Sequence, residues 1–222
     1  MKRWSFIIGL VAGLAWADEP SKLKDEAPRE ESGQAWSVIG ARTVAPQENL
    51  FIAEAGYPTV NVGFLRGIVA GLNLGGRVGF MYGVEGLPRD LAPGVKAQAL
   101  LKFRFFDSGR VSLGLTFEPG FFVASSALQG VRGALNLPVG FRLGIAASSA
   151  LAIAIQLEVP MWIEFGPFGG FNAPILTGGG LEYFITSHLA LFAKARVGPT
   201  LRTNRPAEVA FDASLGVGYH FK

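Results

Sequence analysis

Few residues in this sequence have the types and spacing that catalysis or metal binding requires. There are two histidines, His188 and His220, and no cysteine, so neither a disulfide nor a thiolate metal site can form. Neither histidine belongs to a serine–histidine–acid arrangement, and two histidines so far apart give no metal-ligand spacing. The glycine-rich residues 72–79 are not followed by the helical pattern of a nucleotide-binding loop. The sequence therefore predicts no catalytic residue, no metal site and no cofactor.

The charged residues that could act together recur on one face of a set of alternating segments. If that face is enclosed, the charges either pair with one another, because unpaired buried charges are costly, or line a narrow passage with a weak preference for anions. We favour the ion-pair network. The set has seven basic and five acidic members: Arg77, Lys96, Lys102, Arg104, Arg142, Lys194 and Arg196, with Glu118, Glu158, Glu164, Glu182 and Asp212.

The segments that carry these charges alternate strictly between apolar and small or polar residues, which indicates β-strands. In residues 151–165, for example, Ile155 and Leu157 face one way, and Gln156 and Glu158 face the other. Several segments are longer than the average strand of about 5 or 6 residues and suit the roughly 9 to 11 residues of a membrane-crossing strand. The alternating segments cover residues 50–56, 59–66, 72–84, 95–105 (with Leu100 as an exception), 111–117, 135–145, 151–165, 189–197 and 209–221.

Composition separates this chain from helical membrane proteins. Mean hydropathy is +0.34 and 30 of the 222 residues are glycine, yet no stretch has the about 18 consecutive apolar residues of a membrane helix. We predict an all-β fold, a transmembrane antiparallel up-and-down barrel with ten strands, or alternatively eight. Short periplasmic turns are expected at residues 107–109, 146–150 and 186–188, and longer outer loops at 86–94, 124–132, 166–174 and 198–208.

The first 34 residues differ from the rest. Lys2 and Arg3 precede an apolar stretch, and Ala15 and Ala17 flank Trp16 as in a cleavage site, so residues 1–17 read as a signal peptide. Residues 18–34 carry nine charges and two prolines, which predicts a flexible periplasmic tail. Residues 35–222 form the predicted barrel. The net charge of +3 separates into +2, −3 and +4 for these parts, so it does not indicate a nucleic-acid partner.

Residues 35–222 resemble a Gram-negative outer-membrane β-barrel of the small OmpA/OmpX-like class. The resemblance is sharpest in the last strand, where apolar residues alternate up to a terminal aromatic, as in an assembly signal; Lys222 then departs from the usual ending. The resemblance implies location in the cell outer membrane, contact with its lipid, and the barrel-assembly machinery as a folding partner. We expect a monomer. The signal residues are Leu215, Val217, Tyr219 and Phe221.

Four functions remain open from the sequence. The favoured one is a non-enzymatic barrel with an anchoring, structural or surface-interaction role. The alternative is a narrow channel for small solutes or ions with a weak anion preference. A membrane enzyme acting on lipid would need an indispensable acid such as Asp90, Glu164 or Glu208, but no nucleophile–base pair accompanies them. A soluble periplasmic lipid carrier would need a barrel with its apolar face inside.

Overall fold

A computed structural model describes residues 35–83, 93–126, 130–165, 169–202 and 207–222. The predicted signal peptide, the charged tail and Asp90 lie outside the described residues. Within the described ranges no helix is long and apolar enough to cross a membrane. The described strands are β1 (Asn49–Tyr57), β2 (Thr59–Val69), β3 (Leu72–Met81), β4 (Gly94–Asp107), β5 (Val111–Phe117), β6 (Gly120–Ser126), β7 (Gly130–Asn136), β8 (Val139–Ala146), β9 (Leu151–Val159), β10 (Trp162–Phe165), β11 (Phe171–Pro174), β12 (Leu176–Phe184), β13 (Leu189–Arg202) and β14 (Glu208–Phe221).

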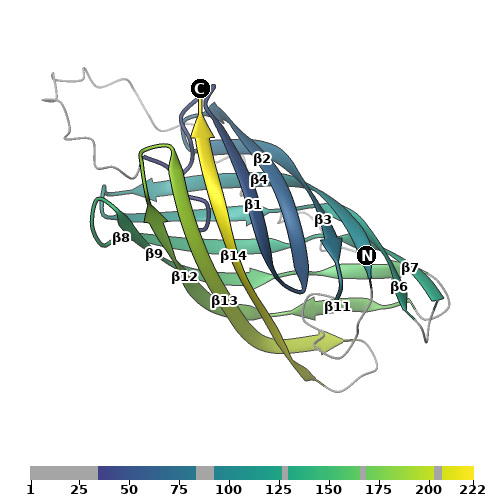
Figure 1. Ribbon diagram of the computed structural model, residues 1–222. Helices are drawn as coiled ribbons and strands as arrows, with labels where there is room; N and C mark the ends of the chain where they lie inside the picture. The colour runs from purple at the N-terminus through teal and green to yellow at the C-terminus, as the bar shows by residue number, and fades with distance from the viewer. Residues whose placement is uncertain (1–34, 84–92, 127–129, 166–168, 203–206) are drawn as a thin grey trace, which may run out of the picture. The chain divides into compact units, whose positions relative to one another are not determined.

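These strands form one closed wall (Figure 1). Four wall strands are each built from two consecutive pieces, which are β5 with β6, β7 with β8, β9 with β10, and β11 with β12. β14 pairs with β1 from Phe221↔Asn49 to Ala213↔Tyr57 and closes the ring. The prediction of a ten-stranded antiparallel barrel is therefore confirmed.

The interruptions within the wall strands coincide with prolines. Pro138 separates β7 from β8, and Pro160 separates β9 from β10. Proline has no N–H to donate to a neighbouring strand, so the ladder breaks there. The alternation of buried and exposed residues nevertheless continues across the break at Pro138. Asn136, Pro138 and Gly140 are all buried, while Val139 is exposed.

The connections differ between the two ends of the barrel. One end, called here the turn end, carries short connections at residues 70–71, 108–110, 147–150 and 185–188, together with Lys222. At the other, the loop end, β3 ends at Met81, β4 begins at Gly94, β6 ends at Ser126, β10 ends at Phe165 and β13 ends at Arg202. The loop end also carries the tight turn at Pro58. Three predicted loop bounds were wrong, because β6 and β7 run into residues 124–132, β11 occupies 171–174, and β13 extends to Arg202.

The wall has an apolar outer face and a mixed inner face. Along β2, Val60, Val62 and Phe64 are exposed while Asn61 and Leu65 are buried. β4 follows the same rule, with one inner apolar residue that broke the sequence pattern. That residue, Leu100, is buried in an apolar cluster inside the turn end, so its packing explains the exception.

Candidate functional site: the barrel interior

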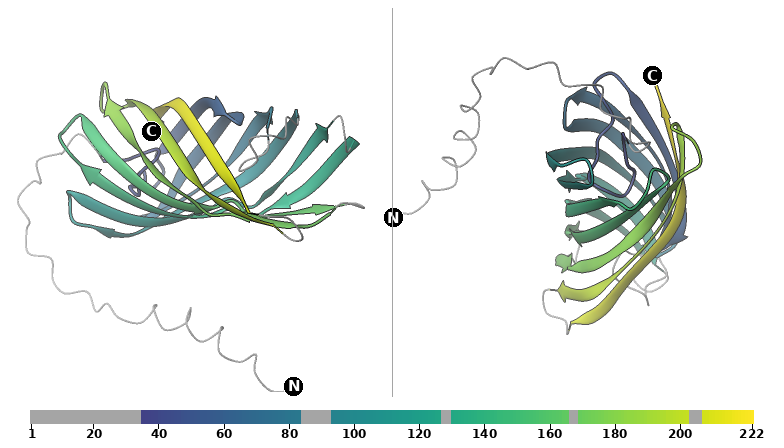
Figure 2. Two further views of the ribbon diagram at one scale, coloured as in Figure 1. Left: turned by 90° about the horizontal axis from the view of Figure 1, so that it is seen from below. Right: turned by 90° about the vertical axis from the view of Figure 1, so that its left-hand side faces the viewer.

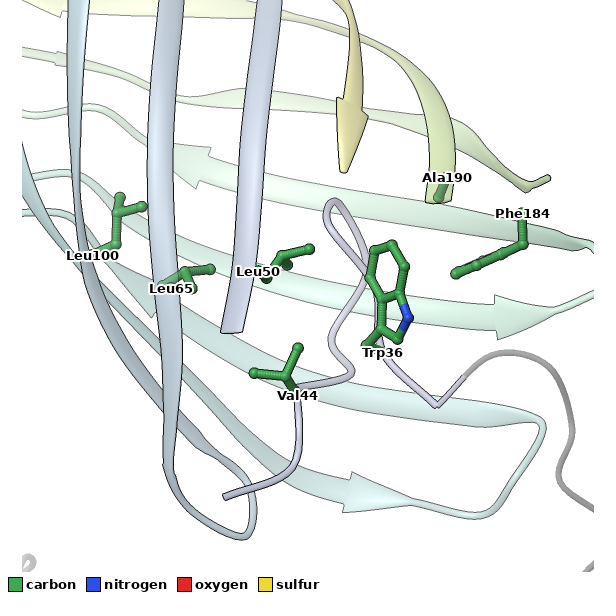
Figure 3. Close-up of a cluster of buried hydrophobic side chains, with 7 residues drawn as sticks. All are labelled: Trp36, Val44, Leu50, Leu65, Leu100, Phe184 and Ala190. Atoms are coloured by element: carbon green, nitrogen blue, oxygen red, sulfur yellow. The ribbon is translucent and has the colours of Figure 1, made fainter. Parts of the chain in front are cut away.

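The interior of the turn end is filled by the chain that precedes β1. Residues 36–44, called here the inner segment, form no strand, and Figure 2 shows this part of the chain within the curve of the strands. Trp36 and Val44 are each 1% exposed and pack with wall residues in one cluster (Figure 3). Trp36 meets the ring of Phe184 edge-on, with ring centroids 5.2 Å apart. The prediction of a barrel over residues 35–222 assigned no strand to residues 35–48 and did not foresee this role, because the segment has no periodic pattern.

Wall side chains bind the backbone of the inner segment. The carboxylate of Glu182 accepts hydrogen bonds from the Ser37 hydroxyl and from the Val38 N–H, the latter at 2.7 Å. The Lys102 ammonium donates to the Ser37 carbonyl oxygen at 2.6 Å. The Gln156 amide donates to the Ile39 carbonyl oxygen at 2.8 Å. These contacts give two of the predicted interior charges, Lys102 and Glu182, a shared role in holding the segment.

Further toward the loop end, one group of charges centres on Arg196. Its guanidinium donates from Nη2 to Asp212 at 2.7 Å and from Nε to both Asp212 oxygens at 3.0 and 3.1 Å. Arg196 also pairs with Glu158, and Glu158 pairs with Arg142. All four side chains are at most 8% exposed. Strands β8, β9, β13 and β14 thus bring four predicted residues into one chain of ion pairs.

A second group of charges centres on Glu54 of β1, which the sequence analysis did not single out. The Lys194 ammonium lies 2.9 Å from one Glu54 oxygen, and Arg77 Nη1 lies 3.4 Å from the other. Arg77 also pairs with Glu118 and donates to the Gln98 side-chain oxygen at 3.1 Å. The alternation in β1 could have identified Glu54, because Glu54 is buried on the inner face while Phe51 and Ala55 are exposed on the outer face.

Together these two groups form what we call the ion-pair layer. Its members are Glu54, Arg77, Glu118, Arg142, Glu158, Lys194, Arg196 and Asp212. Four are acidic and four are basic, so the layer is formally neutral. All eight line a single small cavity, which shows that the topology gathers them in one place.

The remaining predicted charges differ in their surroundings. Lys96 is buried on β4, close enough to Glu54 for the two charges to interact. Glu164 lies nearer the loop end, where its oxygens are 3.7 Å from Arg132 Nη1 and 3.0 Å from Trp162 Nε1. Arg104 lies near the turn after β4 and pairs with Asp107 at 2.6 Å, with its side chain 26% exposed. Arg132 was missed because its segment was predicted to be a loop.

The loop-end interior is also packed with apolar side chains. Trp162 and Met81 are each 2% exposed and form a cluster with Phe122, Ala124 and Ala134. These residues come from β3, β6, β7 and β10. The described interior is therefore layered, with apolar packing at both ends and charges between them.

Two small cavities remain around the ion-pair layer. One has a volume of about 30 Å³ and extends to Tyr57, Pro58 and Thr59 at the loop end. The other has a volume of about 60 Å³ and is floored by Val38 and Ile39 of the inner segment. A space of this size holds a few water molecules. The cavities share Glu54, Arg77, Glu118, Arg142 and Lys194 as lining residues, so the ion-pair layer divides them.

The two histidines lie side by side at the turn end, which their separation along the chain does not predict. Their rings stack with centroids 5.6 Å apart, and His220 Nε2 lies 2.8 Å from a Glu48 oxygen. Trp36 packs against His220 at 5.6 Å. In the part of the chain that the structure describes, no group of three or more His, Asp or Glu residues could hold a metal ion.

The closed wall of antiparallel strands is also found in solved structures of other proteins. The outer-membrane protease OmpT from Escherichia coli matches it with a TM-score of 0.50 and 9% identity, over 82% of this chain and all of that chain. The fold is that of an outer-membrane β-barrel. At 9% identity the likeness concerns the fold and not the chemistry. No protein-family model and no curated sequence matches the chain.

Weaker structural similarity extends to two further barrels. The KdgM porin gives a TM-score of 0.38 at 9% identity, over 79% of this chain and 99% of that chain. The N-terminal β-barrel domain of OprF from Pseudomonas aeruginosa gives 0.34 at 14% identity, over 80% of this chain and all of that chain.

Proposed function

We propose that this chain is a non-enzymatic outer-membrane barrel whose wall and loops, rather than its bore, carry its role as an anchor or surface-interaction scaffold. The observation behind this proposal is the filled interior. In the part of the interior that the structure describes, the inner segment, the neutral ion-pair layer and the loop-end apolar cluster leave small cavities, and the two at the ion-pair layer have volumes of about 30 and 60 Å³. A barrel of this size has an interior that side chains can fill.

The outer face supports placement in a lipid bilayer. Exposed apolar residues cover strand after strand, with Val78 at 60%, Phe121 at 61% and Leu215 at 68% exposure. Soluble proteins rarely expose continuous apolar surface on this scale, and a soluble carrier would place this face inside. In bacterial barrels short turns face the periplasm and longer loops face outward. The turn end, where β1 begins and β14 ends, would then face the periplasm.

Biogenesis by the barrel-assembly machinery belongs to the same proposal. Leu215, Val217, Tyr219 and Phe221 lie on β14, which pairs with β1 to close the ring. Leu215 and Tyr219 are exposed on the outer face. This position leaves them accessible to a partner while the ring is still open. The narrower resemblance to the OmpA/OmpX-like class, and the monomeric state, remain predictions.

Membrane placement predicts a clear fractionation result. The protein should sediment with outer membranes and, on gels, should migrate as a compact species unless it is boiled, because detergent alone does not open a closed barrel. Recovery from the soluble periplasm without detergent, with a single mobility before and after boiling, would contradict the proposal.

The filled interior predicts an electrically silent protein. Purified wild-type protein inserted in planar bilayers should show no discrete conductance steps, because water-sized cavities do not form a continuous path. A known porin inserted under the same conditions serves as the positive control. Regular steps from the wild-type barrel would contradict a closed bore.

A narrow channel is the second candidate, and the two cavities that border the ion-pair layer favour it. If the layer admits ions, wild-type protein should conduct, with a weak preference for anions. Replacing Arg142 by glutamine should then change the step size, since Arg142 lines both cavities. Enzymatic action on lipid has less support, because Glu164 is engaged by Arg132 and Trp162.

A further inference from the structure

The barrel wall is complete without the inner segment. β1 and β14 close the ring through their own register of nine pairs, and residues 36–44 contribute no strand to it. The chain first joins the wall backbone where the Gln47 N–H donates to the Gly67 carbonyl oxygen at 2.9 Å. The segment is therefore an insert within a closed ring, connected to it at one end through residues 45–48.

The described polar contacts of the inner segment are all made through side chains, some from the wall and some from the segment itself. From the segment, Trp36 donates to the Ser187 carbonyl oxygen, and Arg42 donates to the Gly109 carbonyl oxygen and pairs with Asp107. Glu182 receives two donors from the segment, Lys102 donates to its carbonyl oxygens, and Gln156 donates to a third carbonyl. Side-chain contacts of this kind can be replaced by water without breaking the ladder of the wall. Undocking of the segment is therefore separable from unfolding of the barrel.

The cavity above the segment has a mixed lining and contains polar groups without a partner. Three side chains that line it are at least 93% buried, and each has one atom without a hydrogen-bond partner. Those atoms are Asn61 Oδ1, Gln156 Oε1 and Arg142 Nη1. Buried polar atoms that lack a protein partner are normally hydrated, and about 60 Å³ is enough for several waters. Val38 and Ile39 form the floor of this chamber.

We propose that the inner segment is a releasable plug, and that its undocking connects the hydrated chamber to the turn end and admits water and small inorganic ions. The inference rests on the membrane placement proposed above. Docked, the segment closes the chamber with Val38 and Ile39. Undocked, it leaves the ion-pair layer, which borders a cavity on each of its sides, and the loop-end apolar cluster. The smaller of these cavities reaches Tyr57, Pro58 and Thr59 at the loop end.

Two substitutions release the segment by different means. Glu182→Ala removes the carboxylate that binds Ser37 and Val38. Gly218→Leu acts by volume, because even a Cβ at Gly218 would lie 2.4 Å from a Val38 methyl carbon and 3.2 Å from the Trp36 ring. The matched control is Gly133→Leu, also in a wall strand, where the nearest atom to an added Cβ is 3.9 Å away.

Docking is followed by thiol labelling, since the chain has no cysteine of its own. Ile39→Cys places a single thiol at a position that is 4% exposed. With a membrane-impermeant maleimide, labelling should be slow in this background and in the Gly133→Leu control. It should be at least about tenfold faster in the Glu182→Ala and Gly218→Leu backgrounds, because labelling follows the population of the open form. The same two substitutions, without the thiol, should produce conductance steps in planar bilayers of phosphatidylethanolamine and phosphatidylglycerol in potassium chloride.

Each outcome has a defined meaning. Faster labelling without conductance overturns gating, because the segment then leaves while the path stays closed. Unchanged labelling rates in both variants overturn release. Loss of the heat-modifiable folded form in both variants also overturns it, because the segment would then be an inseparable part of the barrel core. Conductance from wild-type protein instead overturns the closed barrel proposed above and leaves release to be judged by the labelling rates.

Discussion

Replacing Glu158 by glutamine is expected to lower the free energy of unfolding by about 3 to 5 kcal/mol, the usual cost of removing one partner from a buried ion pair. Glu158 accepts from Arg142 and Arg196, and its side chain is 7% exposed. The substitution keeps the shape of the side chain but leaves two guanidinium groups with one negative charge fewer. Asp212 still pairs with Arg196, so the uncompensated charge falls mainly on Arg142.

The measurement is urea unfolding of the barrel in detergent micelles, followed by the heat-modifiable gel mobility. The double variant Glu158→Gln with Arg142→Gln restores neutrality in the ion-pair layer and should be more stable than the single variant. Glu208→Gln, at an exposed acid, is the control and should change stability by less than about 0.5 kcal/mol. Two results would contradict the ion pair between Glu158 and Arg142. One is a Glu158→Gln variant as stable as wild type. The other is a double variant whose loss of unfolding free energy equals the sum of the losses of Glu158→Gln and Arg142→Gln alone.

Replacing Trp36 by alanine should cost about 3 to 5 kcal/mol, as expected for deleting a large aromatic side chain from a packed core. Trp36 is 1% exposed, packs against Phe184 and His220, and donates from its indole N–H to the Ser187 carbonyl oxygen at 2.9 Å. The size of this effect is informative, because Trp36 lies outside every strand. If the inner segment only touched the surface of the barrel, the substitution would change the free energy of unfolding by nearly zero.

The same urea titration measures the Trp36 effect, with two variants for comparison. Trp36→Phe keeps an aromatic ring against Phe184 but loses the indole donor, and its loss should stay near 1 kcal/mol, the usual net value of one hydrogen bond. Phe105→Ala, on the outer face at 48% exposure, leaves the interior packing unchanged. If Trp36→Ala is no more destabilising than Phe105→Ala, the inner segment does not contribute to the core.

The wall of the barrel could be predicted from the sequence because alternation is a local property. The apolar outer face appears at every second position, and a proline break such as Pro138 does not shift the parity. Strand ends were less predictable, because β6 and β7 continue through residues that resemble a glycine-rich loop. Even the exception at Leu100 was informative, since an apolar residue on the inner face indicates something apolar inside to pack against.

The interior contents were much less predictable. Ser37 meets Glu182 across 145 positions of sequence, and Gln156 meets Ile39 across 117. Such pairings leave no periodic signal in residues 36–44, whose composition is compatible with a strand or a linker. Parity identified which charges share a face, but not which charge pairs with which. The two histidines come together for the same reason, because strand register rather than sequence spacing makes them neighbours.

The prolines that interrupt the wall lie side by side on adjacent strands. The N–H of Ala99 bonds to the Pro119 carbonyl, that of Glu118 to Pro138, and that of Leu137 to Met161, directly after Pro160. The interruptions therefore form one crease, along which the prolines supply no N–H donor to the ladder. The strands beyond it, β6, β7, β10 and β11, make up one side of the loop end. Because the ladder is interrupted along the crease, that side is joined to the rest of the wall by fewer backbone hydrogen bonds, and the apolar cluster around Trp162 and Phe122 contributes more of its attachment.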